Sequence, residues 1–257
     1  MSVAEPAIPA PTQRPQKMAT LVAQQILSEI TSEGLEAGVM LPPEREMVEK
    51  YGVARGTLRE ALRLLELQGV LTMKPGPKGG PVVCRADGRS LAWAIAAQLQ
   101  RFGASFRTVL DARERLEPAI TAMAAERREQ RDLLVIGGTI AEMRRNLGDF
   151  RTFVGDNHRF HAAVANASRN ALCEVLVTSL RWINDGIVLD AEYREYPRDR
   201  RRRVLASHEL IYDRIAAQDA PGAAAAMHEH IKGENEYLDR HWGHFMNQPL
   251  RWDQVAQ

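Results

Sequence analysis

Between residues 90 and 244 the chain repeats amphipathic segments with helical spacing and contains no run that alternates in the manner of a strand. Expected helices cover residues 90–101, 105–128, 131–146, 150–167, 170–189, 199–218 and 221–244. Each such helix must bury its apolar face, and without a sheet it can do so only against other helices. We therefore expect a mostly α protein whose second domain, over residues 93–245, is an all-α bundle of six or seven helices.

The first part of the chain has a different pattern. Its spacing predicts helices over residues 17–33, 44–51 and 55–68, with a tight turn at Gly52 between the second and third helices. The apolar residues 70–73 and 82–84 flank a segment rich in glycine and proline, which is typical of a β-hairpin. Three helices followed by a hairpin form the plan of a winged helix-turn-helix domain, which we expect over residues 16–85.

The remaining segments lack this periodicity. Four prolines within residues 1–15 predict a disordered N-terminal tail, because proline cannot sustain a helix or a sheet ladder. We expect a linker over residues 86–92 and a C-terminal tail over residues 246–257. The basic run at residues 200–203 is expected to be the solvated first turn of a helix.

Composition limits the class of protein. The 257 residues carry a net charge of +1, with 45% hydrophobic and 26% charged residues, which is typical of a soluble globular chain. Cys84 and Cys173 are far apart, which argues against a disulfide framework and favours a reducing cytoplasm. No apolar run reaches the 18 to 20 residues that span a bilayer. We expect a cytoplasmic protein with no membrane partner.

Positive charge is concentrated on the third expected helix. Residues 1–85 contain ten basic and nine acidic residues, so the total charge does not favour DNA binding and only the placement of the basic residues can. Arg55, Arg59 and Arg63 follow one another at intervals of four, along one helix face. Arginine can donate two hydrogen bonds to guanine, and a recognition helix presents its N-terminal residues to base edges. Arg55 and Arg59 are therefore candidates for base reading, with the alternative that all three arginines only solubilise the helix.

Other residues of this domain suit contact with a phosphate backbone. The hydroxyl of Thr57 can donate to a phosphate or a base, and Lys74 and Lys78 add positive charge to the hairpin. Glycine has no side chain to keep a nucleic acid at a distance. The glycines at these places are Gly56, Gly79 and Gly80.

Three of the seven histidines fall on apolar helix faces: His161, His208 and His230, each on a different expected helix. Neutral imidazole is a common ligand of Zn, Ni, Cu and Fe, and a buried polar ring needs a partner. The three rings could converge on a metal ion, or each could be an ordinary hydrogen-bonded residue of the core. The other histidines are expected at the surface or next to the site: His158, His228, His241 and His244.

Several motifs of the first domain resemble the winged-helix domain of the GntR family of bacterial transcription regulators. They are LPPERE at 41–46, GVARGTLREAL at 52–62, LQGVL at 67–71 and the Gly-Gly-Pro of the hairpin. The resemblance implies operator contacts by Arg45, Arg55 and Arg59, assisted by the hydroxyl of Thr57 and the glycine-rich tip of the wing. Ala54 and Gly56 depart from the residues common in the family, which affects the expected operator sequence more than DNA binding itself.

The second domain resembles the FCD effector-binding domain of the FadR subfamily. The motifs are RERLEP at 113–118, NHRFH at 157–161, ASRN at 167–170, SHELI at 207–211 and AMHEH at 226–230. The resemblance implies a divalent metal, with Zn as the first choice and Ni or another transition metal as alternatives. Its ligands would be Asn157, His161, His208 and His230, with a small carboxylate completing the shell.

Asn157 stands where many members of the family have aspartate. An amide oxygen can ligate a metal but brings no negative charge, so we expect a lower metal affinity, and a metal-free polar pocket stays an alternative. Asp156 cannot take over without distortion, because one residue is about 100° around a helix. Arg113 could pair with an effector carboxylate, or could hold Glu117 structurally.

These observations predict a function. We expect a homodimeric transcription regulator, a repressor and not an enzyme, that binds a palindromic DNA operator and responds to a small organic acid. One alternative is a metal-free regulator of the same family that responds to an acyl thioester. A three-histidine metalloenzyme is a weaker alternative, since no nucleophile–base pair and no H-E-x-x-H motif accompanies the histidines.

Overall fold

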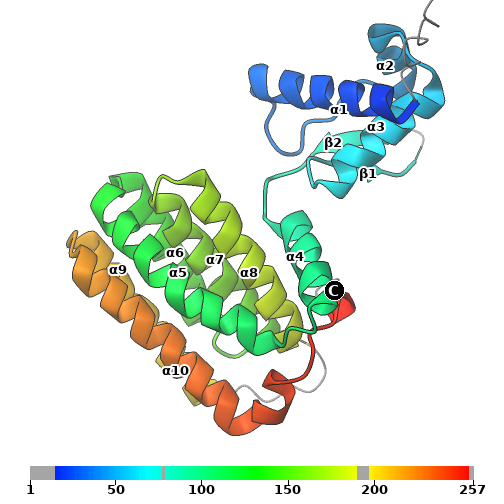
Figure 1. Cartoon of the computed structure of the whole chain (residues 1–257). Helices are drawn as coiled ribbons and strands as arrows, with labels where there is room; N and C mark the ends of the chain where they lie inside the picture. The colour runs from blue at the N-terminus through cyan, green and yellow to red at the C-terminus, as the bar shows by residue number, and fades with distance from the viewer. Residues whose placement is uncertain (1–14, 77–78, 190–196, 255–257) are drawn as a thin grey trace, which may run out of the picture. The chain divides into compact units, whose positions relative to one another are not determined.

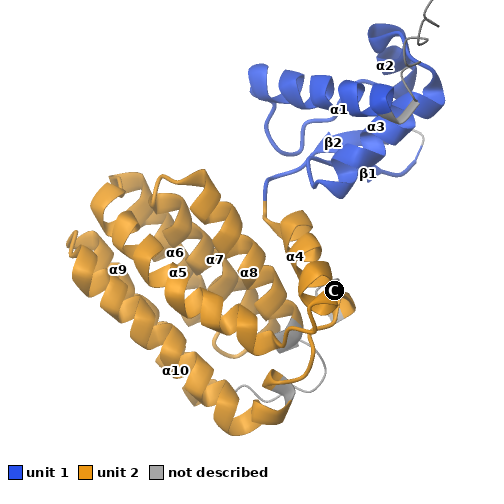
Figure 2. Cartoon of the chain, viewed as in Figure 1, with its two compact units in different colours: residues 1–86 blue, residues 87–257 orange. Residues whose placement is uncertain are grey.

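The computed structural model describes residues 15–76, 79–189 and 197–254. The chain divides into two compact units, residues 1–86 and residues 87–257 (Figure 2). No helix in the described ranges combines the length and the apolar character needed to cross a bilayer. The N-terminal tail expected over residues 1–15 lies outside these ranges, apart from Pro15, and so does Lys78.

Unit 1 is a winged helix-turn-helix domain, as the sequence predicts (Figure 1). Its elements are α1 (Pro15–Ser32), α2 (Glu44–Tyr51), α3 (Arg55–Leu67), β1 (Leu71–Lys74) and β2 (Gly80–Val83). The two strands pair antiparallel, with Leu71 opposite Val83. Gly52 ends α2 with a φ of 62°, a left-handed conformation that glycine adopts without steric cost.

Apolar spacing explains how unit 1 packs. The residues Leu58, Leu62 and Leu65 lie on one face of α3 and are at most 2% exposed, within a core shared with α1. A polar contact ties α1 to α2: the Glu29 carboxylate accepts hydrogen bonds from the Tyr51 hydroxyl at 2.6 Å and the Lys50 ammonium at 2.9 Å. The opposite face of α3 is left to the solvent.

Unit 2 is the expected helical bundle (Figure 1). Its elements are α4 (Arg89–Arg101), α5 (Phe106–Arg127), α6 (Gln130–Arg145), α7 (Phe150–Ala167), α8 (Ala171–Leu189), α9 (Arg198–Ala216), α10 (Ala220–Met246) and the short 3₁₀ helix Trp252–Gln254. Helix α5 contacts α7, α8, α9 and α10, so the side chains of all five helices can meet around it. That arrangement brings together histidines that are far apart in the sequence.

The junction between the units differs from the expected linker over residues 86–92. Helix α4 begins at Arg89, and α8 holds the residues before it. The Ser179 hydroxyl donates to the Gly88 carbonyl and the Trp182 indole N–H donates to the Asp87 carbonyl, both at 2.9 Å. The sequence analysis did not identify these donors, which come from a helix about 90 residues later.

The C-terminal segment also differs from the tail expected over residues 246–257. Leu250 is buried, and its backbone N–H donates to the Ala104 carbonyl at 2.9 Å. The backbone N–H of Trp252 donates to the Gln100 side chain at 2.9 Å, and its indole packs edge-on against that of Trp93. Two large apolar side chains thus anchor a segment too short to show helical periodicity.

Candidate metal centre and DNA-binding surface

The exposed face of α3 carries the arginines that the sequence singled out. Arg55, Arg59 and Arg63 are all exposed, opposite the buried leucines of the same helix. Arg59 donates to the Glu44 carboxylate at 2.9 Å, and Arg45 lies 3.7 Å from Glu49 with its side chain 84% exposed. Such exposed ion pairs contribute little stability, so these side chains can exchange their partners at small cost.

The other predicted residues of this surface have different environments. Thr57 is half-buried, while Gly56 and Lys74 are exposed. A side-chain carbon added at Gly56 or Gly80 would meet no atom of the described structure within 4 Å, whereas one at Gly79 would collide with the Lys74 carbonyl. The fold itself therefore requires glycine at 79, and at the other two positions glycine leaves the backbone open to a partner.

Unit 2 brings the three predicted histidines together. His161 on α7, His208 on α9 and His230 on α10 each offer a ring nitrogen, and these nitrogens lie within 4.8 Å of one another. The Nε2 atoms of His208 and His230 are 3.3 Å apart. All three rings are buried, and Phe160 stacks on His208 with 3.8 Å between ring centroids. The fold thus produces a compact nitrogen donor set from three separate helices.

Glu117 orients one of these rings, a role that the sequence did not reveal. Its Oε2 lies 2.5 Å from Nδ1 of His161, and its Oε1 accepts from Nε of Arg113 at 2.6 Å. The remaining nitrogen of His161, Nε2, is buried and has no hydrogen-bond partner among the described residues. A carboxylate on one imidazole nitrogen and an open second nitrogen is the arrangement typical of metal-ligating histidine.

Burial sets the protonation of the cluster. It lowers the pKa of His161 to about 4, although the charge of Glu117 opposes the shift. Burial and the neighbouring imidazoles hold the pKa values of His208 and His230 well below the usual 6.5. Burial alone would raise the pKa of Glu117, but the charges of Arg113 and His161 lower it overall. At neutral pH the rings are uncharged, which is the form that binds metals.

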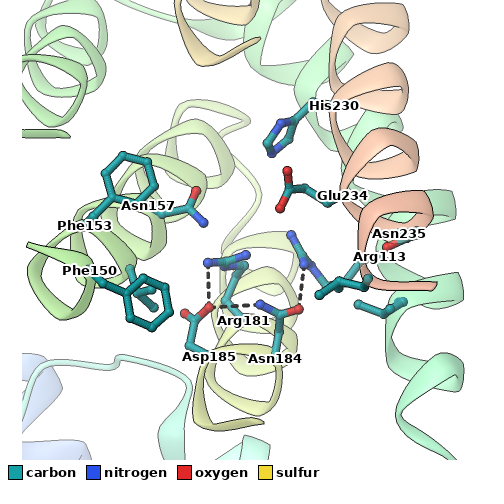
Figure 3. Close-up of a pocket in the computed structure, with 13 residues that line it drawn as sticks. Arg113, Phe150, Phe153, Asn157, Arg181, Asn184, Asp185, His230, Glu234 and Asn235 are labelled. Carbon is teal, nitrogen blue, oxygen red and sulfur yellow. Dashed lines mark hydrogen bonds and ion pairs between the residues drawn. The ribbon is translucent and has the colours of Figure 1, made fainter. Parts of the chain in front are cut away.

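Asn157 faces the same cavity as His230 (Figure 3). Its Oδ1 is buried with no partner in the part of the chain that the structure describes. Asp156 is turned elsewhere: it is fully buried and accepts hydrogen bonds from Asn146, at 2.7 Å, and from Arg159. The carboxylate of Asp156 is therefore committed to other partners, and the amide of Asn157 shares the cavity with His230.

The cavity lies between α5, α7, α8 and α10 and measures about 40 Å³ as space for the centres of water molecules. Phe150 and Phe153 lie on one side, and Arg181 and Asp185 rise from α8 (Figure 3). The sequence analysis did not identify this buried pair, although a charged i, i+4 pair within an otherwise apolar helix is a usable signal.

Arg113 also lines the cavity. The sequence left its role open between an effector carboxylate and Glu117. In the structure its Nε bonds Glu117, and its Nη1 donates to Asn184 at 3.1 Å (Figure 3). Two of its donor groups therefore hold protein side chains around the histidine cluster.

The four histidines outside the cluster have different environments. His158 lies 2.9 Å from Asp185 and 5.0 Å, between ring centroids, from Trp182, whereas His241 bonds only the Tyr237 carbonyl among the contacts described. His228 is half-buried and His244 is exposed.

The run at residues 200–203 is only partly solvated, because Arg200 donates to the Gly233 carbonyl and Arg201 is buried. The first turn of α9 packs against α10, which explains the difference.

Known proteins share both units. The family described as "Bacterial regulatory proteins, gntR family" matches residues 19–78, and the FCD domain matches residues 108–233. The Bacillus subtilis protein named "Uncharacterized HTH-type transcriptional regulator YcbG" is 30% identical over 224 residues, covering 84% of this chain and 87% of YcbG. LutR of the same organism is 27% identical over 210 residues, covering 79% and 93%.

Two further comparisons agree. The galactonate operon transcriptional repressor of Escherichia coli is 27% identical over 204 residues, covering 74% of this chain and 82% of the repressor. The structure of a Streptococcus agalactiae GntR protein superposes with a TM-score of 0.59 at 22% identity, covering 85% and 99% of the two chains, and so shares the fold. The relatives are transcription regulators, which removes the metalloenzyme alternative. This chain belongs to the GntR family of DNA-binding bacterial transcription regulators and carries an FCD domain as its second unit.

Proposed function

We propose that the protein is a FadR-type repressor that acts in the cytoplasm as a homodimer on a palindromic operator. A two-fold symmetric dimer presents one reading helix to each half-site, which is the usual match between such proteins and their DNA. The observation that carries DNA reading is the exposed arginine face of α3. The proposed DNA-contacting residues are Arg45, Arg55, Gly56, Thr57, Arg59, Lys74, Gly79 and Gly80.

The proposed cofactor is a divalent metal, with Zn²⁺ as the first choice and Ni²⁺ or another transition metal as alternatives. His161, His208 and His230 would hold it together with the amide oxygen of Asn157. The neutral rings and the two unpartnered buried atoms, His161 Nε2 and Asn157 Oδ1, support this assignment. A bound metal would supply positive charge at the cavity, which favours an anionic ligand.

The proposed effector is a small organic acid, and its binding would lower the affinity for the operator. The size of the cavity supports a small ligand over the long acyl chain of a thioester. One relative carries the name of a galactonate operon repressor, which supports both an acid effector and repression.

DNA reading is tested by removing the two arginines that open α3. An operator is selected from a random DNA library with the wild-type protein, and binding is then measured by fluorescence anisotropy at several salt concentrations. Each bidentate contact to a base is worth about 1–3 kcal/mol, so Arg55→Ala/Arg59→Ala should weaken binding by about 30-fold or more. Arg131→Ala, an exposed arginine of α6, should leave binding unchanged. Full affinity in the double variant would reject these residues as the reading face.

The metal is tested by elemental analysis of protein purified without an affinity metal or a chelator. We expect about one divalent ion per chain in the wild type and none in His208→Ala, because two imidazoles hold a metal much less tightly than three. His241→Ala is the matched control, since this exposed ring lies outside the cluster. A metal-free wild type that also fails to take up added Zn²⁺ would contradict the proposed cofactor.

A further inference from the structure

One arginine on the exposed face of α3 is held by a residue of another helix. Nε of Arg59 donates to Oε2 of Glu44, the first residue of α2, at 2.9 Å. Among the described residues, neither Arg55 nor Arg63 has an acidic partner, and the Nη atoms of Arg59 have no hydrogen-bond partner. Because the pair joins positions 15 residues apart, it fixes Arg59 relative to α2 as well as to its own helix.

Both partners of this pair stand on a rigid backbone. Pro43 directly precedes Glu44, and its φ of −56° is close to the value of about −65° that the proline ring imposes. Met47 anchors α2 in the core, and Leu58 anchors α3 beside Arg59, since both side chains are buried. The Glu44 side chain is 31% exposed and that of Arg59 is 71% exposed. The carboxylate is therefore the better-fixed partner, and the long arginine side chain takes its direction from it.

The bond to Glu44 determines which donors of Arg59 are left for another molecule. A guanidinium carries N–H donors on Nε and on both Nη atoms. Glu44 occupies Nε, and the donors on the two Nη atoms stay open. A bidentate contact to O6 and N7 of guanine needs two donors side by side. Arg59 is thus able to read a guanine with the end of its guanidinium while Glu44 holds the side.

The charge of Glu44 acts in a second way. An exposed ion pair is weak in the free protein because water screens it. DNA that covers the pair would exclude this water and strengthen the attraction between the two side chains. The same carboxylate repels phosphates, on which binding to any DNA sequence depends. A guanine that accepts from the Nη atoms of Arg59 offsets this repulsion, whereas another base at that place does not.

We propose that Glu44 is a positioning residue for sequence reading: it holds Nε of Arg59 so that the Nη donors reach a guanine of the operator, and its charge disfavours other DNA. This inference rests on the proposed function, because it specifies how one arginine of the reading face is oriented. Loss of Glu44 would therefore reduce the selectivity of the protein for its operator without a general loss of DNA binding.

Selectivity is measured with the full-length protein on two duplexes of equal length and base composition, the operator selected with the wild-type protein and a scrambled sequence. Fluorescence anisotropy gives a Kd for each duplex, and the Kd for the scrambled duplex divided by that for the operator is the selectivity ratio. Glu44→Ala should lower this ratio by about threefold to tenfold, a part of the discrimination that one bidentate contact supplies. It should also tighten binding to the scrambled duplex, because a negative charge is removed.

Glu46→Ala is the matched control. It removes an exposed carboxylate from the same first turn of α2, and this carboxylate makes no bond to Arg59 in the described structure. Both duplexes should bind more tightly to this variant by the same factor, so the selectivity ratio should not change. Glu44→Gln keeps an acceptor for Nε without the charge and should restore most of the ratio. Circular dichroism and urea unfolding confirm the fold of each variant.

Arg59→Ala decides whether Glu44 acts through this arginine. Arg59→Ala should lower the selectivity ratio, and Glu44→Ala added to it should lower the ratio no further, because the two residues act as one unit. An unchanged ratio in Glu44→Ala, or an equal further loss in the Arg59→Ala background, would overturn the positioning role and leave the reading face intact. An unchanged ratio in Arg59→Ala would instead reject Arg59 as a reader, and the role of Glu44 with it.

Discussion

At the scale of single residues, Asn157 determines the charge of the proposed metal site. The three imidazoles are neutral, and an amide adds no charge, so the positive charge of a divalent ion is not balanced by its protein ligands. The Glu117 carboxylate contacts Nδ1 of His161, so the imidazole ring separates it from the free Nε2 that would hold the metal. An anionic ligand that entered the cavity would meet this excess charge.

Asn157→Asp should therefore raise the affinity for Zn²⁺ by at least about tenfold, because a carboxylate is the stronger ligand for a divalent ion. Competition with a fluorescent chelator measures the change. Asn247→Asp adds the same charge at an exposed position and should leave the Zn²⁺ affinity unaltered. Equal or weaker binding by Asn157→Asp would place Asn157 outside the ligand set.

At the scale of elements, glycine has opposite consequences at two helices. Gly88, which caps α4, has a φ of 77°, and a side-chain carbon there would lie 2.8 Å from the backbone nitrogen of Ser179 on α8. Gly138 lies within α6, is exposed, and would meet nothing in the described structure within 4 Å. The first position needs glycine, whereas the second only adds flexibility to the unfolded chain.

Gly88→Ala should destabilise unit 2 by about 1–3 kcal/mol through the strained φ and the contact with α8. Gly138→Ala should stabilise it by roughly 0.5–1 kcal/mol, the usual difference between alanine and glycine in a helix. Urea unfolding followed by circular dichroism measures both. If Gly88→Ala left the free energy of unfolding unchanged, the segment before α4 would have to move freely away from α8.

The same scale shows what a sequence can and cannot predict. Periodicity placed each helix within two residues of its observed ends, because apolar spacing reports directly on the buried face of a helix. The three histidines were found because a polar ring on an apolar stripe is conspicuous. Glu117, Arg181 and Asp185 were not, since which charged residues pair inside a bundle depends on the packing of distant helices.

At the scale of the whole molecule, the two units have separate cores. One hydrophobic cluster contains only residues from 19–83, and the other clusters contain only residues from 92–250. The proposed metal ligands all lie in unit 2. Metal binding should therefore stabilise one unit and leave the other unaffected.

Differential scanning calorimetry should show two unfolding transitions, and Zn²⁺ should raise the midpoint temperature of only one of them. At a free Zn²⁺ concentration of 100 times Kd the stabilisation of unit 2 would be about 2.7 kcal/mol. A chelator should reverse the shift, and His208→Ala should abolish it. A single transition that moves as a whole would show that the two units unfold cooperatively.

The separation of the cores also bears on how such chains diversify. A recombination event near residue 87 would split no hydrophobic cluster of the described structure, so a new DNA-reading head could be joined to an existing sensor without repacking either. The few bonds that α8 makes to Asp87 and Gly88 lie on the sensor side of that point and go to backbone carbonyls. A recombinant would have to keep Gly88 together with the second unit, and the reading head is then free to change its operator.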